Sequence, residues 1–330
     1  MSRKLITALS VGGLAMLLML GIFLLPRKGE WKTDTFRQDS GINICEVDGI
    51  TCRKKTRMKA YLFLGCDAQL DPEGEQSEGL VVAGQSDMIE LLVIDQNEDT
   101  YATIPINRNT MTMIDSLEED GTFIASSEAQ ICLAHAKGDG REISCENAVK
   151  AVSDLLYGIP IDGYIAMSLS SIGAINDLVG GVTVTIEDDF SKEDPSLVMG
   201  STVTLNAKQA ESFVRGRMSV ADGSNENRMK RQNQYLAEYK KLFMEKCAAS
   251  ERFVLNAYKD MDSYMVTDLS GNDCSKIAKA ILKNDYLGNM EISGTVGEDH
   301  LGYATFEPDH ESIRDIVIDL FYERLDETNE

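Results

Sequence analysis

Histidine is scarce in this chain, with only His135, His300 and His310 among 330 residues. They are too scattered in the sequence to indicate a histidine metal site. His135, in the glycine-rich loop LAHAKGDG, is expected to serve in packing or hydrogen bonding. The motifs G-x-S-x-G and H-E-x-x-H and the P-loop are also absent. The sequence therefore gives no support to the enzyme classes that these motifs identify.

The seven cysteines form no C-x-x-C pair and show no zinc-ligand spacing. One pair stands out in CEVDGITC, because a two-residue turn at Asp48 and Gly49 places Cys45 opposite Cys52 in a hairpin. These two side chains form either a disulfide or a pair of small buried thiols, and both alternatives stay open.

Positive charge is in short supply, since 32 lysines and arginines stand against 54 aspartates and glutamates, for a net charge of -22. The residues before about Ala60 are net basic, and the remainder is strongly acidic. An acidic surface repels phosphate backbones, which argues against a nucleic-acid partner. The hydrophobic content of 43% is enough for a substantial core, so the chain is expected to be globular.

Only one long hydrophobic run occurs, Leu5 to Leu25, and it carries no charge. Its length is about the 20 residues needed to cross a bilayer core. No small-x-small cleavage site ends it, so it is expected to remain as an anchor. Basic residues flank both sides and do not orient it, but a long C-terminal domain can be translocated regardless. Residues 1–26 are therefore predicted to form a cytoplasmic tip and a transmembrane anchor.

After the anchor, residues 27–59 read as a polar connector that contains the Asp-Gly hairpin. From Ala60 onward strand and helix patterns alternate, which predicts a single α/β domain over residues 60–330. Three early segments have strand character: AYLFLG, MIELLVID and TYATIPI. Four later segments predict helices, the second of them followed by a glycine stop and a strand: CENAVKAVSDLLYG, SIGAINDLVGGVTVTI, CSKIAKAILKN and ESIRDIVIDLFYERL.

Three charged residues stand at the ends of the early strands. Asp67 directly follows the first strand, Asp87 directly precedes the second, and Arg108 follows the third. The short link QNED favours an antiparallel hairpin between the second and third strands. If the first strand also pairs antiparallel, all three residues reach one end of the sheet. Two carboxylates there suit Mg²⁺, although aspartate is also common as a plain turn residue at strand ends.

Arginine is concentrated between Glu211 and Leu236. The segment SFVRGR alternates as a strand does, which predicts that Arg215 and Arg217 project from one face.

A helix is expected to begin near Asn225, with Arg228, Arg231 and Gln232 on one side of it. Arginines in a first helical turn oppose the macrodipole at a cost of a few tenths of a kcal/mol each. A bound anion removes this conflict, so a phosphate site is one interpretation. The alternative is that the arginines pair with surrounding acids such as Glu211.

With these residues in hand, the chain resembles the LytR-CpsA-Psr family of membrane-anchored bacterial cell-envelope proteins. The resemblance runs in order from about Ala60 to Leu236. Its segments are YLFLGCD, SDMIELLVID, IPINRNT, LLYGIPIDGYIAM, INDLVGGVTVTI, LNAKQAESFVRGR and NRMKRQNQYL.

The resemblance implies a three-layer αβα sandwich around a mixed β-sheet, outside the cytoplasmic membrane, with a hydrophobic cleft for a polyprenyl chain. It also implies transfer of a polyprenyl-diphosphate-linked glycopolymer, of teichoic acid or capsular polysaccharide type, onto peptidoglycan through a phosphodiester. Mg²⁺ (or Mn²⁺) is the implied cofactor.

The family's motif residues are carried over position by position. By position, Asp67 and Asp87 match the family's acidic metal and diphosphate residues. Arg108 is expected to stabilise charge on the reacting phosphoryl group, together with Asp87. The remaining matches are expected to bind the diphosphate: Arg215, Arg217, Arg228, Arg231 and Gln232.

Two positions depart from the family pattern, Gln69 in place of an arginine and Asn109 in place of an aspartate. Two further functions therefore stay open beside the transferase. The first is a non-catalytic membrane receptor for lipid-linked diphosphates, which the two departures favour. The second is a transcriptional attenuator, which the anchor and the acidic domain disfavour.

Overall fold

The computed structural model describes residues 37–38, 44–47, 50–67, 84–168, 170–216, 220 and 225–325. Its centre is a sheet in which β4 (Met58–Cys66), β5 (Ser86–Asp95) and β6 (Thr100–Ile106) follow one another as antiparallel neighbours. The predicted antiparallel pairing of the second and third strands is thereby confirmed, and the first strand also pairs antiparallel, with the second. They form because each strand is an apolar run buried on both faces, and a short polar turn joins the second to the third.

Three further strands complete the six-stranded sheet in the order β12-β9-β4-β5-β6-β13. The added strands are β9 (Gly163–Ser168), β12 (Met265–Thr267) and β13 (Asp285–Asn289). β9 runs parallel to β4 and β13 runs parallel to β6, whereas β12 is antiparallel to β9. The sheet is therefore mixed, as expected.

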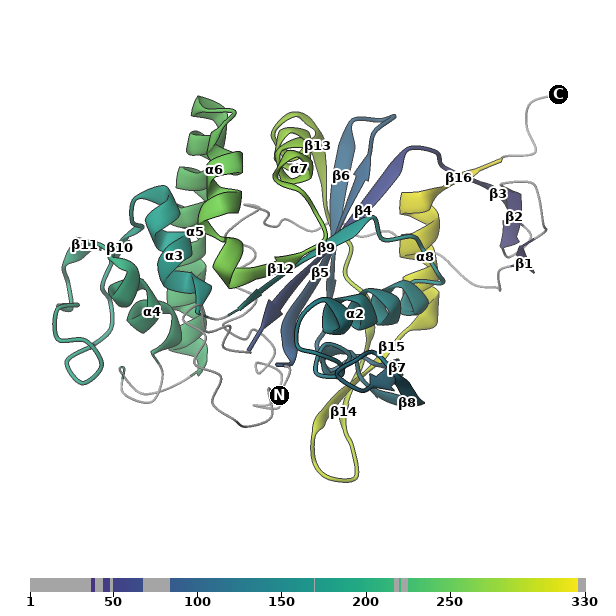
Figure 1. Cartoon of the computed structure of the whole chain (residues 1–330), viewed down its shortest axis with the longest axis horizontal. Coiled ribbons are helices and arrows are strands. Elements are labelled where there is room, and N and C mark those ends of the chain that lie inside the picture. The colour runs from purple at the N-terminus through teal and green to yellow at the C-terminus, as the bar shows by residue number, and fades with distance from the viewer. Residues whose placement is uncertain are drawn as a thin grey trace.

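Helices cover both faces of this sheet, as Figure 1 shows. Successive residues of β5 alternate between two apolar clusters, with Leu91 and Val93 in one and Leu92 and Ile94 in the other. The first cluster is closed by α2 (Glu142–Leu155) and α8 (His310–Phe321). The second is closed by α3 (Ser171–Val179), α5 (Asn225–Ala249), α6 (Phe253–Asp260) and α7 (Gly271–Lys283). The α/β fold is confirmed.

The predicted stop after the α3 sequence is also observed. Gly180 caps α3 with a φ of 84°, a left-handed conformation that glycine adopts without steric cost. The chain then enters β10 (Thr183–Thr185), which pairs antiparallel with β11 (Thr202–Thr204).

The connector hairpin is confirmed by its register. β2 (Ile44–Val47) pairs with β3 (Ile50–Lys54) so that Cys45 lies opposite Cys52. The turn and the Cys45 side chain lie outside the described residues, so the bridge stays a prediction. β1 (Arg37–Gln38) and β16 (Tyr322–Arg324) flank this pair, which joins the connector to the end of the domain.

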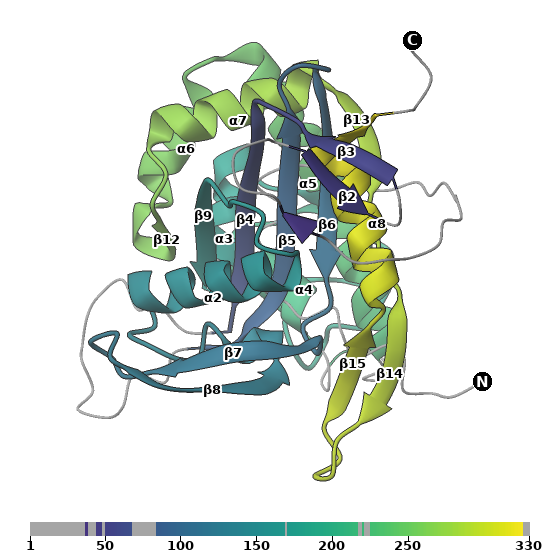
Figure 2. The same ribbon diagram turned by 90° about the vertical axis from the view of Figure 1, so that its right-hand side faces the viewer.

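Two more hairpins project from one end of the molecule, as Figure 2 shows. They consist of β7 (Met111–Leu117) with β8 (Phe123–Gln130), and β14 (Gly294–Glu298) with β15 (Ala304–Pro308). Short 3-10 helices lie at Ile131–Leu133 (η1) and Asp262–Tyr264 (η2).

The predicted anchor, residues 5–25, lies outside the described residues. Within the described part of the chain, no helix combines the length and the apolar character that crossing a membrane requires.

Candidate active site

The ends of β4, β5 and β6 bring the three predicted residues to one edge of the sheet. Asp67 follows β4, Asp87 is the second residue of β5, and Arg108 lies two residues beyond β6. Arg108 Nη1 lies 2.8 Å from Asp87 Oδ1, with 23% and 13% of the two side chains exposed. The expected meeting of carboxylate and arginine is therefore observed, with Asp87 inside its strand instead of before it.

The residues around Arg108 keep its guanidinium charged and leave its Nε–H without a partner among the described residues. Burial lowers its pKa, but contacts with Cys132, Asp87 and Asp67 outweigh this and raise the pKa above its usual value. Its Nη2 donates to Gln85 Oε1 and lies 3.5 Å from Cys132 Sγ. Its buried Nε has no hydrogen-bond partner among the described residues. A buried unsatisfied donor is costly, so this position favours an incoming acceptor such as a phosphate oxygen.

The side chains of Gln85 and Cys132 contact Arg108, which the sequence alone did not reveal. Gln85 stands before β5, where its backbone carbonyl accepts from Asp67 N–H at 3.1 Å. Cys132 lies in η1, and its backbone N–H donates to Arg108 O at 3.1 Å. Neither residue belongs to a motif, and only the tertiary pairing shows their roles.

His135 forms a hydrogen bond to the segment just before β5, which confirms its expected hydrogen-bonding role. It is 2% exposed, and Nδ1 lies 2.7 Å from Gly84 O, next to Gln85. Its Nε2 lies 3.5 Å from Cys66 Sγ and 3.6 Å from Cys145 Sγ. Burial lowers the pKa of His135, so the neutral ring donates from Nδ1 to the carbonyl.

The strand predicted for SFVRGR is wrong, because this segment ends a helix, α4 (Ala207–Arg215). A capping box starts the helix: Gln209 N–H donates to Asn206 Oδ1 at 2.9 Å and Asn206 N–H to Gln209 Oε1 at 3.1 Å. Phe213 and Val214 are consecutive and both buried, which does not fit a strand with one buried face. The alternation of six residues was too short to distinguish the two structures.

The predicted strand face is not formed at Arg215. Arg215 is exposed as the last residue of α4, and Arg217 lies outside the described residues. No hydrogen bond or ion pair in the described part of the chain joins Arg215 to Asp67, Asp87 or Arg108.

The expected helix near Asn225 is confirmed as α5, but it places Arg231 in the interior, with 4% of the residue exposed. Arg231 Nε donates to Phe213 O at 3.1 Å, and Nη2 donates to Gly216 O. Its Nη1 is ion-paired with Asp188. Arg231 thus braces the C-terminus of α4 and is not presented as an exposed phosphate ligand.

Gln232 acts on the same helix end, since its Nε2 donates to Val214 O at 3.2 Å. The side chain of Arg228 lies outside the described residues. Among the side chains expected to bind the diphosphate, Arg215 is therefore the exposed one in the described part of the chain, and Arg231 and Gln232 fix the helix that carries it.

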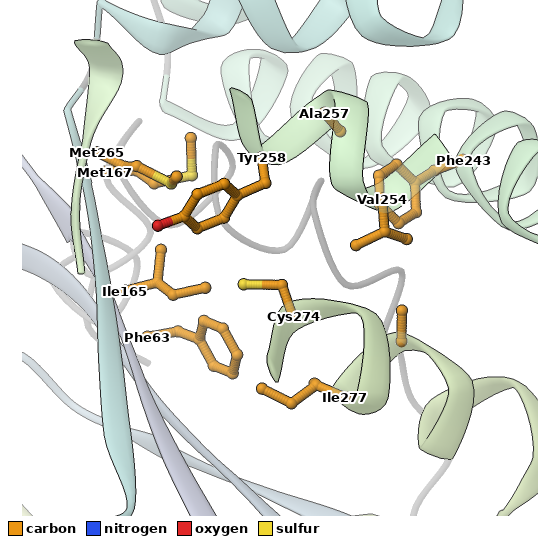
Figure 3. A pocket seen from close by; sticks show the side chains of 11 residues that line it. Phe63, Ile165, Met167, Phe243, Val254, Ala257, Tyr258, Met265, Cys274 and Ile277 are labelled. Carbon is orange, nitrogen blue, oxygen red and sulfur yellow. The ribbon is translucent and has the colours of Figure 1, made fainter. Parts of the chain in front are cut away.

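An apolar cavity lies on the α5–α7 face of the sheet, and Figure 3 shows its lining. Phe63 and Ile165 reach it from neighbouring strands, Tyr258 from α6 and Cys274 from α7. Its volume of about 50 Å³ is small beside roughly 300–1,000 Å³ for ordinary ligand pockets. The cleft for a polyprenyl chain that the resemblance implies therefore stays a prediction.

Comparison with known proteins gives distant relatives. The chain is 28% identical over 225 residues to biofilm regulatory protein A of Streptococcus mutans, covering 63% of this chain and 48% of that protein. It is 27% identical over 232 residues to polyisoprenyl-teichoic acid–peptidoglycan teichoic acid transferase TagU of Enterococcus faecalis, covering 69% and 68%. The chain thus spans about half the length of the first relative.

Solved structures share the fold. B. subtilis TagV aligns with a TM-score of 0.53 and 21% identity, over 80% of this chain and 97% of the other. The LytR_cpsA_psr family model matches residues 28–320, nearly the whole domain and its connector. The chain therefore belongs to the LytR_cpsA_psr family.

Proposed function

We propose that this protein transfers a polyprenyl-diphosphate-linked anionic glycopolymer, of teichoic acid or capsular type, onto peptidoglycan through a phosphodiester. The observation that carries the proposal is Arg108, held beside Asp87 at the sheet edge with a buried Nε that has no hydrogen-bond partner among the described residues. The name of the E. faecalis relative, a teichoic acid transferase, supports the reaction class.

In this reaction a peptidoglycan hydroxyl attacks the phosphorus nearest the sugar. One P–O bond forms to the acceptor, the P–O bond to the lipid phosphate breaks, and lipid monophosphate leaves with the electron pair. Negative charge accumulates on the phosphoryl oxygens in the transition state, where a fixed guanidinium stabilises it. Arg108 fits this role because Asp87 and Gln85 hold its Nη1 and Nη2 in place, so that little reorganisation is needed.

Asp67 and Asp87 fit a hard divalent cation. The described residues contain no group of three or more His, Cys, Asp or Glu side chains placed to hold a metal ion. Two carboxylates with substrate phosphates and waters are nevertheless the usual ligand set of Mg²⁺, and Mn²⁺ accepts the same donors. When bound, such an ion would neutralise diphosphate charge beside Arg108.

The apolar cavity is the proposed position of the polyprenyl chain. Its wall is formed by strands on one side and by α6 and α7 on the other. Since the cavity holds only about 50 Å³, a lipid chain enters only if these helices move away from the sheet. Met167 and Met265 line it, and their flexible side chains adapt to irregular apolar ligands.

The proposed location is the outer face of the cytoplasmic membrane, with residues 5–25 as a single-pass anchor. Support comes from the uncharged length of that segment, and the lipid-linked donor and the peptidoglycan acceptor are both found on that side. The acidic composition continues to argue against a nucleic-acid partner, and so against the attenuator.

The test uses the full chain in detergent micelles with a polyprenyl-diphosphate glycan, peptidoglycan fragments and Mg²⁺ or Mn²⁺. Mass spectrometry should detect a phosphodiester product, a chelator should prevent its formation, and Arg108→Ala should slow its formation about a hundredfold. Arg141→Ala is the matched control, because the side chain of this arginine is 59% exposed and, among the residues that the structure describes, its ion pair is with Glu142 at 3.7 Å. Tight donor binding without any product would instead favour the non-catalytic receptor.

A further inference from the structure

The two projecting hairpins are built directly onto the residue after Arg108. Asn109 O accepts from Phe306 N–H at 2.9 Å, and Thr110 forms a parallel bridge with Phe306. Gln130 Nε2 donates to Ala304 O at 2.6 Å and to Asn109 Oδ1 at 3.3 Å, which ties the hairpins together. Residues 109–130 and 291–309, here named the hairpin platform, are therefore joined to each other at Asn109 and Thr110, which follow Arg108 in the chain, and both hairpins project from the same end of the molecule (Figure 2).

The hairpin platform exposes large apolar side chains to solvent, whereas most such side chains in the described residues are buried. Phe123 is 59% exposed and Tyr303 is 63% exposed. The described residues contain eleven large hydrophobic side chains that are exposed, and six of them lie here: Met113, Phe123, Ile124, Val296, Leu301 and Tyr303. Consecutive strand residues such as Phe123 and Ile124 point to opposite faces, so these side chains are divided between the faces of the two hairpins. Their concentration on two hairpins that are joined beside Arg108 in the chain indicates a binding surface.

The charge of the platform decides which partner fits. Residues 109–130 contain five aspartates and glutamates, residues 291–309 contain another five, and neither range contains a lysine or an arginine. Asp115 is offset by Lys150 of α2, 3.4 Å away. A surface of this sign repels a phosphate-rich glycopolymer and anionic lipid headgroups, whereas the exposed Arg215 on the other side of the domain attracts them.

A strand of N-acetylated amino sugars has the complementary chemistry. Each ring presents an apolar face of C–H groups, which stacks on the negative face of an aromatic ring. Its edge carries hydroxyl and amide donors, which carboxylates accept. Phe123 and Tyr303 supply the rings, and the platform's acids and the Ser and Thr hydroxyls of β8 and β14 supply the polar partners.

We propose that the hairpin platform binds the acceptor, a neutral amino-sugar glycan strand, and presents its hydroxyl to the phosphorus at Arg108. The inference rests on the proposed function and names the acceptor side of that site. In this arrangement the acidic platform does not attract the anionic donor, so the donor does not compete for the acceptor's site.

The test measures binding to the wall without any donor. The full chain in detergent micelles is sedimented with peptidoglycan sacculi stripped of anionic polymers, and it is titrated with a soluble chitin oligosaccharide. The double variant Phe123→Ser/Tyr303→Ser should lose about tenfold or more in apparent affinity. The control Val198→Ser/Met199→Ser, exposed by 61% and 64% between β10 and β11, should bind as wild type does.

Three outcomes decide the matter. Loss of glycan binding in the platform variant alone, with unchanged circular dichroism and unchanged donor affinity, supports the acceptor surface. Equal binding by all three proteins overturns it, and so does a variant that loses affinity for a short-chain anionic phospholipid and not for the glycan. Because this assay contains no donor, its result is independent of the transfer assay. Wall binding by wild type here, together with no product in the transfer assay, would remove the proposed function and leave the glycan surface standing.

Discussion

Glu90 makes the stability of the domain depend on pH. It lies in the middle of β5, opposite Phe63 on β4 and Pro105 on β6, and only 7% of it is exposed. Burial raises its pKa from the usual 4.5 to about 7, although a hydrogen bond from Thr103 opposes the shift. At mildly acidic pH the carboxyl is therefore neutral beside Phe63, which lines the apolar cavity.

The direction in which stability changes with pH follows from the linkage between folding and proton binding. Between pH 4.5 and about 7 the folded protein holds a proton on Glu90 that the unfolded chain has released, so stability falls as pH rises through this window. Above about pH 7 the buried carboxylate of Glu90 is charged, and the decrease in the free energy of unfolding is complete. A shift of this size corresponds to about 3 kcal/mol, since one pKa unit is about 1.4 kcal/mol.

The assay is urea unfolding of the full chain in detergent micelles, followed by far-ultraviolet circular dichroism at about pH 5 and about pH 8. Glu90→Gln keeps the shape and the contact with Thr103 but cannot ionise. It should match wild type at the lower pH and exceed it by up to about 3 kcal/mol at the higher one. Glu98→Gln, at an exposed glutamate of the turn after β5, should follow wild type at both. If Glu90→Gln loses stability with pH in parallel with wild type, Glu90 is not the source.

Four further outcomes are expected. Arg108→Ala should lower turnover at saturating donor by about a hundredfold, and Arg108→Lys should rescue it poorly; an effect on affinity alone would contradict the catalytic role. Arg231→Ala should lower the free energy of unfolding by about 3–5 kcal/mol, because it leaves Asp188 unpaired beside a broken helix brace; an unchanged urea midpoint would contradict this. Gly163→Ala should destabilise by about 1–3 kcal/mol, because its Cβ would lie 2.4 Å from Leu269 Cδ2; equal melting temperatures would contradict it. A reporter fused after the last residue should be active only outside the cytoplasm, and activity inside would refute the envelope location.

Much of the fold follows from local patterns, and the errors have physical causes. The early strands are long apolar runs joined by a short turn, so their pairing is local and was predictable. The parallel pairing of β9 with β4 depends on a crossover through α2, and β13 returns from the far end of the chain. Such long-range partners leave no signature in the sequence around each strand.

In the candidate site, too, some residues could be predicted from the sequence and others could not. Asp67, Asp87 and Arg108 were found because antiparallel neighbours bring strand ends together, which needs only the strand order. Gln85 reaches Arg108 through a segment that His135 holds from another part of the chain. No spacing rule relates these residues, so their contact had to come from the tertiary structure.

The arginine-rich segment combines two roles that its sequence does not separate. An arginine near the start of α5 was expected to oppose the helix dipole and so to need an anion. Arg231 instead meets the carbonyl end of α4, at Phe213 and Gly216, where the partial charge is negative. The C-terminus of one helix therefore replaces the anion for this residue. Arg215 ends the same helix and is exposed, so the internal arginine fixes the position of the exposed one, which stays a predicted diphosphate ligand.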